Sequence, residues 1–302
     1  MRAAVIGIGS NSVRSLVTDV TGAEFERLWR DREGTRLFAG LDAHGNLNRE
    51  SMDKAVAAVR RMASEAVQQG AEKLAVFATS AARDAANGDV FMAEVEQETG
   101  VPLQIISGEE EAELSFLGAS AAITAKRCGM IDIGGGSTEI AVGSATGIEE
   151  AFSCQMGAVR LYRKLRLENS EDMKPVEMAA AEILDEQLQK YPGLELPEAW
   201  VGTGGTFTTL AAMALGQPWT DRTHVHGIRI SAGEIRDIGE RLAGMNVEAR
   251  KQLPGMQPSR ADIVVHGICI LLGVMGRLGI RQITVSEWGN LDGYIRKYFC
   301  TV

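Results

Sequence analysis

The chain has 302 residues, 45% of them hydrophobic and 24% charged, with a formal net charge of −9 at pH 7. This composition is that of a soluble globular protein, and the length suits two domains better than one. The acidic balance argues against a broadly basic nucleic-acid surface. It leaves room for an anionic substrate held by local amide groups, a few arginines or a divalent cation.

The sequence also bears on location. No apolar stretch approaches the ~20 residues that span a bilayer, and the opening MRAAVIGIGSNSV suits a first β-strand better than a secretory signal. The four cysteines form no CxxC pair and no metal-ligand spacing, so we expect reduced thiols. We therefore expect a cytoplasmic protein that binds neither nucleic acid nor membrane.

The first half of the chain is predicted to alternate strands and helices. Two strands joined by a turn come first, at 3–9 and 13–20, and a polar stretch follows through about Asn48. The next elements have apolar residues at helical or strand spacing: a helix at 50–69, a strand at 73–80, a helix at 88–99, a strand at 103–107 and a helix at 109–123.

The same order then restarts with a strand–turn–strand unit at 129–143 and an ambiguous segment at 153–167. The remaining predicted elements are helices at 175–190, 206–215, 231–243 and 259–278, strands at 200–205 and 282–287, and a short terminal helix. Such alternation predicts an α/β fold with helices on both faces of each sheet. We place the domains at 1–124 and 125–302, and the terminal helix could pack back on the first.

Two segments repeat one pattern of apolar residues around a turn of small residues: AVIGIGSNSVRSLV at 4–17 and GMIDIGGGSTEIAV at 129–142. When they are aligned, Gly7 falls on Asp132 and Arg14 falls on Glu139. Two such turns at the starts of the two halves suggest a duplicated domain with a cleft between the copies. One copy therefore lacks the acid that the other carries.

Three turns rich in glycine and serine or threonine are candidates for binding phosphate: GSNS at 9–12, GGGST at 134–138 and GTGGT at 202–206. Glycine lets backbone N–H groups approach one point, and a hydroxyl adds a donor. The third turn precedes a helix, whose dipole would also favour an anion. Each turn alone could equally be a plain hairpin connection.

Asp132 lies within an apolar strand, where a carboxylate is costly unless it is paired or bound to a metal. Asp132 and Glu139 flank the glycine turn, and Mg²⁺ prefers one or two carboxylates together with water and phosphate oxygens. These two acids are our candidate metal ligands, although Glu139 could instead be a solvated strand residue.

Two further segments place charged side chains beside predicted strands. ISGEEEAEL at 105–113 brings three consecutive acids to a helix start, where Ser107 would be the N-cap and one acid could activate a water. ATSAARDAANG at 78–88 brings Arg83 to the end of a strand, where it could clamp phosphate or simply pair with Asp84 or a nearby Glu. One basic group could extend a track for a polyanion or form a solvated helix face: Arg160, Arg163, Lys164 and Arg166.

Six segments occur in an order and spacing that resemble the exopolyphosphatase / guanosine pentaphosphate phosphohydrolase (Ppx/GppA) family of the actin–Hsp70–sugar kinase superfamily: IGSNSVR, ATSAARDAAN, ISGEEEAELSFLGA, IDIGGGSTEIAVG, GTGGTFTTLAAM and RADIVVHGICIL. The resemblance spans nearly the whole chain, without the additional C-terminal helical domain of longer members. It implies two similar ribonuclease H-like (actin-like ATPase) domains. It also implies hydrolysis of a terminal phosphoanhydride, with Mg²⁺ or Mn²⁺, in an interdomain cleft.

The resemblance also implies roles for single residues. Glu110 matches the family's proposed water-activating base, and Asp132 and Glu139 match its metal-linked carboxylates. The residues that match phosphate contacts are Ser10, Asn11, Ser12, Arg14, Arg83, Gly135, Gly136, Ser137, Gly204, Gly205 and Thr206.

The chain departs from the family pattern at two positions. Gly7 stands where the family usually has Asp, and Leu291 stands where the family's Gly-Leu-Arg-Asp/Glu-Gly segment has Arg. These changes could weaken cation binding and leave an enzyme of low activity, or a protein that binds a phosphorylated ligand without turnover. Gly7 could also have been introduced artificially.

Taken together, the sequence predicts a hydrolase that acts on inorganic polyphosphate or on the 5′-γ-phosphate of guanosine pentaphosphate. One alternative is a non-catalytic sensor of these ligands. Another is a small-molecule kinase of the same superfamily, against which we see no clear adenosine pocket. The apolar helix expected at 261–278 would permit a homodimer.

Overall fold

The computed structural model describes residues 1–144, 146–222 and 224–301. The chain divides into two compact units. The first unit comprises Met1–Gly118 and Asn290–Val302, and the second comprises Ala119–Gly289. The sequence suggested a boundary a few residues later, at 124, and assigned the last residues to the second domain while allowing the terminal helix to pack back on the first. In the structure these last residues belong to the first unit.

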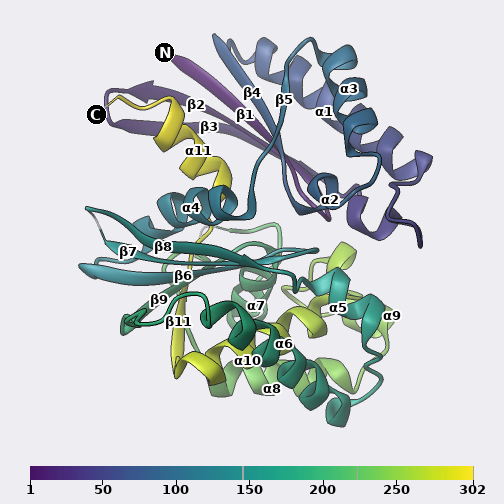
Figure 1. Ribbon diagram of the computed structural model, residues 1–302, viewed down its shortest axis with the longest axis vertical. Helices are drawn as coiled ribbons and strands as arrows, with labels where there is room; N and C mark the ends of the chain where they lie inside the picture. The colour runs from purple at the N-terminus through teal and green to yellow at the C-terminus, as the bar shows by residue number, and fades with distance from the viewer. Residues whose placement is uncertain (145, 223, 302) are drawn as a thin grey trace. The chain divides into compact units, whose positions relative to one another are not determined.

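A five-stranded sheet forms the centre of the first unit, in the order β3-β2-β1-β4-β5 (Figure 1). Its strands are β1 Arg2–Ile8, β2 Val13–Thr21, β3 Glu24–Glu33, β4 Lys73–Ala78 and β5 Leu103–Ile105. The strands β1, β2 and β3 pair antiparallel, whereas β1, β4 and β5 run parallel. The parallel edge is where the two helical connections of this unit enter the sheet.

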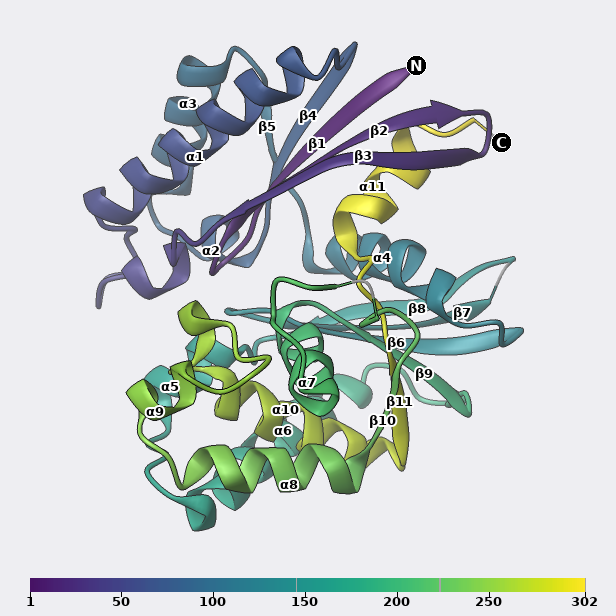
Figure 2. The same cartoon turned by 180° about the vertical axis from the view of Figure 1, so that it is seen from behind.

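Helices cover both faces of this first sheet (Figures 1 and 2). They are a 3₁₀ turn at Leu37–Gly40, α1 Arg49–Gln68, α2 Ser80–Arg83, α3 Gly88–Thr99, α4 Gly108–Ala119 and α11 Asn290–Tyr298. Successive residues of β1 point to opposite faces. Ala4 packs with α1 on one face, and Ala3 and Val5 belong to the apolar cluster of α4 and α11 on the other.

The strand β3 occupies part of the stretch that the sequence had left as merely polar. Its sequence, EFERLWRDRE, alternates exposed and half-buried residues and carries many charges. β3 is an edge strand, and charged side chains on such a strand oppose pairing with other chains. Its half-buried positions mix Phe25 and Trp29 with Arg27 and Asp31, so they give no apolar pattern by which the strand could be identified.

The second unit contains a six-stranded sheet in the order β10-β11-β9-β6-β7-β8. Its strands are β6 Arg127–Ile133, β7 Thr138–Ser144, β8 Gly147–Cys154, β9 Ala199–Thr203, β10 Arg229–Ser231 and β11 Gln282–Val285. The strands β6, β7 and β8 pair antiparallel, and β6, β9 and β11 run parallel. β10 closes the far edge antiparallel to β11.

The helices of the second unit are α5 Ala158–Lys164, α6 Met173–Leu188, α7 Gly205–Leu215, α8 Ala232–Ala243, α9 Val247–Lys251 and α10 Val264–Leu278. The apolar helix α10 packs between α6 and α8 (Figure 2). Short 3₁₀ segments lie at Ser120–Ala122, Ser170–Asp172 and Pro258–Arg260. The segment 153–167, ambiguous in the sequence, contains the end of β8 and the helix α5. Within the described ranges, no helix has the length and apolarity needed to cross a bilayer.

The sequence repeat is a repeat of structure. The order β3-β2-β1-β4-β5 in the first unit matches β8-β7-β6-β9-β11 in the second, with the same pattern of antiparallel and parallel neighbours. β10 is an addition at one edge. The prediction of two similar α/β domains is therefore confirmed, and each begins with a hairpin that carries one of the aligned turns.

Candidate functional site

The turns of the two hairpins have the same backbone geometry. In the first, the Gly9 N–H donates to the carbonyl of Ser12 across 3.0 Å, and in the second the Gly134 N–H donates to the carbonyl of Ser137 across 3.0 Å. The strands that lead into them also share a register. Gly7 is paired with Arg14 in one hairpin, and the aligned pair in the other is Asp132 with Glu139.

The carbonyl groups of each turn are bound by the backbone that follows. In the first unit the carbonyl of Ser10 accepts from the Phe38 N–H at 2.8 Å, and that of Asn11 accepts from two amides of the same loop. In the second unit the carbonyl of Gly135 accepts from the N–H groups of Val159 and Arg160 at 2.9 and 3.0 Å. Each turn is therefore tied down through its oxygen atoms.

The N–H groups at the centre of each turn are left available. Within the described ranges, the amides of Ser10, Asn11, Gly135 and Gly136 donate to no acceptor. The Asn11 side chain is 5% exposed, and its Nδ2 finds no partner among the same residues. Clustered backbone donors with fixed geometry are suited to an anion. The buried Nδ2 of Asn11 also favours a bound anion, because burying a polar group without a partner costs free energy that an anion would recover.

The turn hydroxyls are not all equally available. The Ser10 and Ser80 hydroxyls share a hydrogen bond of 2.7 Å, which joins the first turn to the start of α2. The Ser12 hydroxyl accepts from Arg32 Nε at 3.2 Å. In the second turn, Ser137 is 1% exposed. The Ser12 hydroxyl only accepts in this bond, so among the described residues its O–H is available as a donor beside the backbone amides.

The two acids of the second hairpin are buried side by side. Asp132 and Glu139 are 8% and 1% exposed and are directly opposed on antiparallel strands, so that their side chains leave the same face of the sheet. The Ser153 hydroxyl donates to Glu139 Oε1 at 2.8 Å. Burial first, and then the charge of Glu139, raises the pKa of the Cys154 thiol to about 12. Cys154 is therefore a neutral neighbour of this pair.

These two carboxylates fit a hard divalent cation such as Mg²⁺. Such an ion takes one or two protein carboxylates and completes its coordination with water and phosphate oxygens. Among the described residues, no group of three or more His, Cys, Asp and Glu side chains is arranged to hold a metal. A cation at this acid pair would therefore need oxygen atoms from its substrate and from water.

The third glycine turn lies directly against Asp132. Gly204 has a φ of +88°, which favours glycine, and a Cβ at this position would lie 2.4 Å from Asp132 Oδ1. A Cβ at Gly205 would lie 1.8 Å from Arg260 Cζ, so the guanidinium of Arg260 covers the N-terminus of α7. Thr206, the next residue, is 2% exposed. The second unit thus brings together a glycine turn, the N-terminus of α7, the positively charged side chain of Arg260 and the two acids Asp132 and Glu139.

Arg260 was not selected from the sequence. It is the first residue of the segment RADIVVHGICIL, and its Nε donates to the Gln257 side chain at 3.2 Å. The only feature of the sequence that could have indicated Arg260 as a site residue is its position shortly before a long apolar helix. That signal is weak, because the contact with α7 joins residues far apart in the chain.

Arg83 and Glu111 pair in the first unit. Arg83 Nη1 donates to the carbonyl of Ile106 at 2.9 Å and to Glu111 Oε2 at 3.4 Å. Its Nη2 is buried without a partner among the described residues. The pairing with a nearby Glu that the sequence allowed is therefore present, and one guanidinium nitrogen remains unused.

The acidic run 109–111 begins the helix α4, with the predicted N-cap confirmed by a bond from the Glu110 N–H to Ser107 Oγ at 3.1 Å. Glu109 is exposed, Glu110 is half-buried and Glu111 is buried. The Tyr298 hydroxyl, on α11, donates to Glu110 Oε1 at 2.5 Å. Of the three acids, Glu110 thus combines partial exposure with a fixed orientation.

The two departures from the family pattern touch each other. A Cβ at Gly7 would lie 2.8 Å from Leu291 Cδ2 and 3.1 Å from Phe77 Cζ. The neighbouring Asn290 accepts a hydrogen bond from Arg14 Nη2 at 3.0 Å. The start of α11 therefore covers the base of the first hairpin, and an apolar contact fills the place that corresponds to Asp132.

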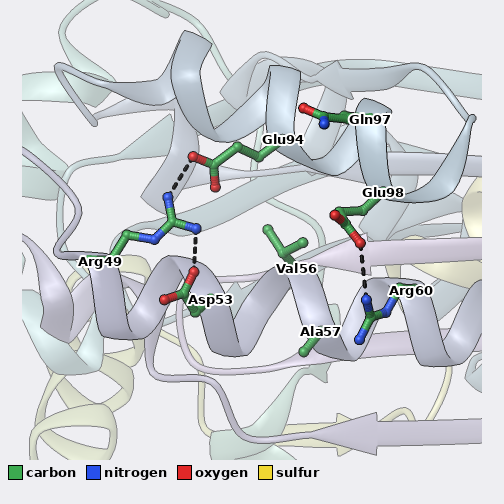
Figure 3. A pocket seen from close by; sticks show the side chains of 8 residues that line it. All are labelled: Arg49, Asp53, Val56, Ala57, Arg60, Glu94, Gln97 and Glu98. Carbon is green, nitrogen blue, oxygen red and sulfur yellow. Dashed lines mark hydrogen bonds and ion pairs between the residues drawn. The ribbon is translucent and has the colours of Figure 1, made fainter.

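Two other charged regions are less suited to a phosphate. Arg160 of the basic group donates from Nε to the carbonyl of Gly136 at 2.5 Å, whereas Arg166 pairs with Glu168 on the surface. Figure 3 shows a groove between α1 and α3 in which arginines face acids of the same groove. The pairs drawn there are Arg49 with Asp53, Arg49 with Glu94, and Arg60 with Glu98. These arginines are already neutralised.

Two duplicated α/β units with donor-rich hairpin turns define a protein of the actin-like ATPase fold. The chain belongs to the Ppx/GppA phosphatase family, whose model matches residues 16–298. It is 34% identical to Exopolyphosphatase 2 of Mycobacterium tuberculosis over 310 residues, with 97% of each chain covered. It is 31% identical to Exopolyphosphatase 1 of Mycobacterium bovis, covering 98% of this chain and 87% of that one.

Solved structures agree with this assignment. The crystal structure of an exopolyphosphatase-like protein matches with a TM-score of 0.88 and 27% identity, covering 99% of this chain and 98% of that one. The PPX-GPPA enzyme of Aquifex aeolicus matches with a TM-score of 0.83 and 26% identity, covering 98% of this chain and 99% of that one. Because these matches cover nearly the whole chain, the family fold extends over both units.

Proposed function

We propose that this protein is a Mg²⁺-dependent hydrolase, with Mn²⁺ as a substitute, that releases the terminal phosphate of inorganic polyphosphate. The observation that carries the proposal is the pair of hairpin turns with unused amides, one of which is flanked by two buried acids. The family and the names of the relatives, which are exopolyphosphatases, support this substrate. Guanosine pentaphosphate ends in the same kind of bond and is the second substrate to assay.

In this proposal the chain's own residues orient the substrate. The amides of the two turns and the guanidinium of Arg83 bind phosphate oxygens, and Gly204–Thr206 at the start of α7 adds further donors. Asp132 and Glu139 hold the cation, which neutralises phosphate charge when bound. Positioning and charge neutralisation are the main protein contributions to phosphoryl transfer.

Glu110 acts as the general base. Its carboxylate takes a proton from the water that attacks the terminal phosphorus, the bridging P–O bond breaks, and the products are orthophosphate and a chain one phosphate shorter. A positioned base contributes about 10²–10⁴-fold in rate. The proposal has Glu110 of the first unit and Asp132 of the second act on the same substrate.

The test is phosphate release from polyphosphate and from guanosine pentaphosphate by the wild-type chain and by Glu110→Gln. We expect turnover to need Mg²⁺, to stop in EDTA, and to fall at least about 100-fold in the variant. The matched control is Glu109→Gln, which neutralises the exposed neighbour and should keep activity within about twofold. Equal rates for Glu110→Gln and the wild type would remove Glu110 from this role.

A second candidate function is binding without turnover. The contact between Gly7 and Leu291 favours it, because the first hairpin has no carboxylate where the second has Asp132. Tight binding of either substrate by the wild-type chain, with no phosphate released in Mg²⁺ or Mn²⁺, would support this sensor. The kinase alternative would require phosphate transfer to an acceptor. A cytoplasmic location and a homodimer remain predictions.

A further inference from the structure

We propose that Tyr298 is a positioning residue for the base Glu110, so that the last helix of the chain sets the orientation of the group that activates water. This inference rests on the proposed role of Glu110. It concerns a residue that lies outside all the glycine turns and outside the acidic run.

The hydrogen bond is the first element of the argument. The Tyr298 hydroxyl donates to Glu110 Oε1 at 2.5 Å, which is the length of a hydrogen bond from a hydroxyl to a charged carboxylate. Both residues belong to the first unit. A carboxylate with one oxygen fixed in this way has its second oxygen, Oε2, directed by the geometry of the first, and Oε2 can then accept the proton of a water.

The second observation concerns the aromatic contacts that hold Tyr298 in place. Its ring lies 4.6 Å from that of Tyr294, which in turn stacks on Phe77 of β4 at 5.3 Å. Phe77 and Tyr294 belong to the buried cluster beneath α4 and α11. The phenol is thus joined through two aromatic contacts to the sheet, and its position is set by the core rather than by a loop.

A second contact joins the same two helices. Lys297 Nζ lies 2.9 Å from Glu113 Oε2, one turn further along α4. Because both groups of this ion pair are partly exposed, it contributes little to stability. It offers a way to separate the loss of the Tyr298 hydrogen bond from a general loosening of α11.

The protonation of Tyr298 suits a donor. Burial first, and then the hydrogen bond and negative charge of Glu110, raises the pKa of Tyr298 above its ordinary value, while Lys297 opposes the shift. The phenol therefore keeps its proton at neutral pH. In the reaction the proton of water goes to Glu110 Oε2, and Tyr298 retains its own.

The main test is the steady-state kinetics of Tyr298→Phe with polyphosphate and Mg²⁺. We expect kcat to fall about tenfold or more and KM to stay within about twofold, because the substrate contacts are unchanged and only the base is misaligned. Tyr162→Phe removes a similarly exposed hydroxyl in the second unit and should leave both parameters unchanged. Glu113→Gln breaks the ion pair between α4 and α11 at the partner that does not contact Tyr298, and it should change kcat less than twofold. A loss equal to that of Tyr298→Phe would overturn the proposal in favour of a structural role for α11.

A spectroscopic test does not depend on turnover. Tyrosinate absorbance should titrate at lower pH in Glu110→Gln than in the wild type for two of the four tyrosines, because Glu110 raises the pKa of both Tyr298 and Tyr294. The component from Tyr298, which alone is hydrogen-bonded to Glu110, should be missing in Tyr298→Phe. An unchanged titration in Glu110→Gln would show that the two groups are not in contact, and this reading remains valid even if Tyr298→Phe folds poorly.

The double variant separates this inference from the proposed function. If Tyr298 acts through Glu110, Tyr298→Phe has no further effect on kcat once Glu110 is Gln. Full turnover by Glu110→Gln would contradict the proposed function itself. Loss of turnover in Glu110→Gln with an unchanged kcat in Tyr298→Phe would overturn the positioning role alone.

Discussion

The two hairpins combine one backbone with opposite charges. Each turn has the same internal hydrogen bond, carbonyls bound by the following segment and amides left available. At the base, the first hairpin pairs Gly7 with Arg14, and the second pairs Asp132 with Glu139. A duplicated turn can therefore keep its available backbone N–H groups while the side chains at the base of the hairpin change. The conserved geometry suits an anion in both units, and only the second also suits a cation.

The divergence is coupled to packing. Because Leu291 and Phe77 fill the space above Gly7, the first hairpin is closed at the point where the second has an acid. A carboxylate could not be added there without displacing Leu291. The two departures from the family pattern are therefore one structural change.

The largest effect is expected from neutralising the second hairpin. Asp132→Asn should lower kcat/KM for polyphosphate at least about 100-fold, since it removes a preorganised charge from the proposed cation site. Asp19→Asn on β2, where Asp19 pairs with Arg2 on the surface, is the control and should stay near wild type. The measurement is kcat/KM of each variant from steady-state rates over a range of Mg²⁺ concentrations. If Asp132→Asn keeps full activity at low Mg²⁺, the cation is not held there and the contrast between the hairpins loses its functional meaning.

The next effect comes from making the first hairpin resemble the second. Gly7→Asp should lower the free energy of unfolding by about 2–4 kcal/mol, because it places a carboxylate against Leu291 and Phe77. Adding Leu291→Arg should recover a large part of the loss by giving the acid a partner. Urea unfolding of the two single variants and the double variant measures this coupling. Additive losses would show that the two positions are independent.

The smallest effect sharpens the comparison within the turns. Asn11 of the first turn aligns with Gly136 of the second, so only the first turn has a side-chain amide. Asn11→Ala should weaken polyphosphate binding by about 1 kcal/mol, or roughly fivefold, and should not lower stability, because the Asn11 Nδ2 has no partner among the described residues. Calorimetric titration of polyphosphate into the Glu110→Gln background isolates binding from turnover. Unchanged affinity would place the phosphate away from the first turn.

The sequence predicted much of the fold because its strongest signals are local. The hairpins alternate apolar residues around small-residue turns, and helices such as α1 have regular apolar spacing. The strands β3, β8 and β10 were not predicted. β3 has only a half-buried inner face, and β8 carries two glutamates within eight residues, so both lack an apolar pattern that stands out.

The residues of the candidate site likewise fall into those that the sequence identified and those that it did not. The turns, Asp132 and the acidic run could be identified, because their residue types are unusual for their local context. Tyr298, Arg260 and the contact of Leu291 with Gly7 could not, since each depends on chain segments that are brought together only by tertiary packing. An aromatic residue at the end of an amphipathic helix gives no local sign that its hydroxyl meets a carboxylate on α4.

The membership of α11 in the first unit has a consequence for biosynthesis. The ribosome makes residues 1–118 and then the whole second unit before it reaches α11. Until then, Leu114 and Phe77 lack their cover of Leu291, Tyr294 and Ile295. The first unit therefore completes its core only after the second unit has been made, and until α11 docks the nascent chain exposes an apolar face.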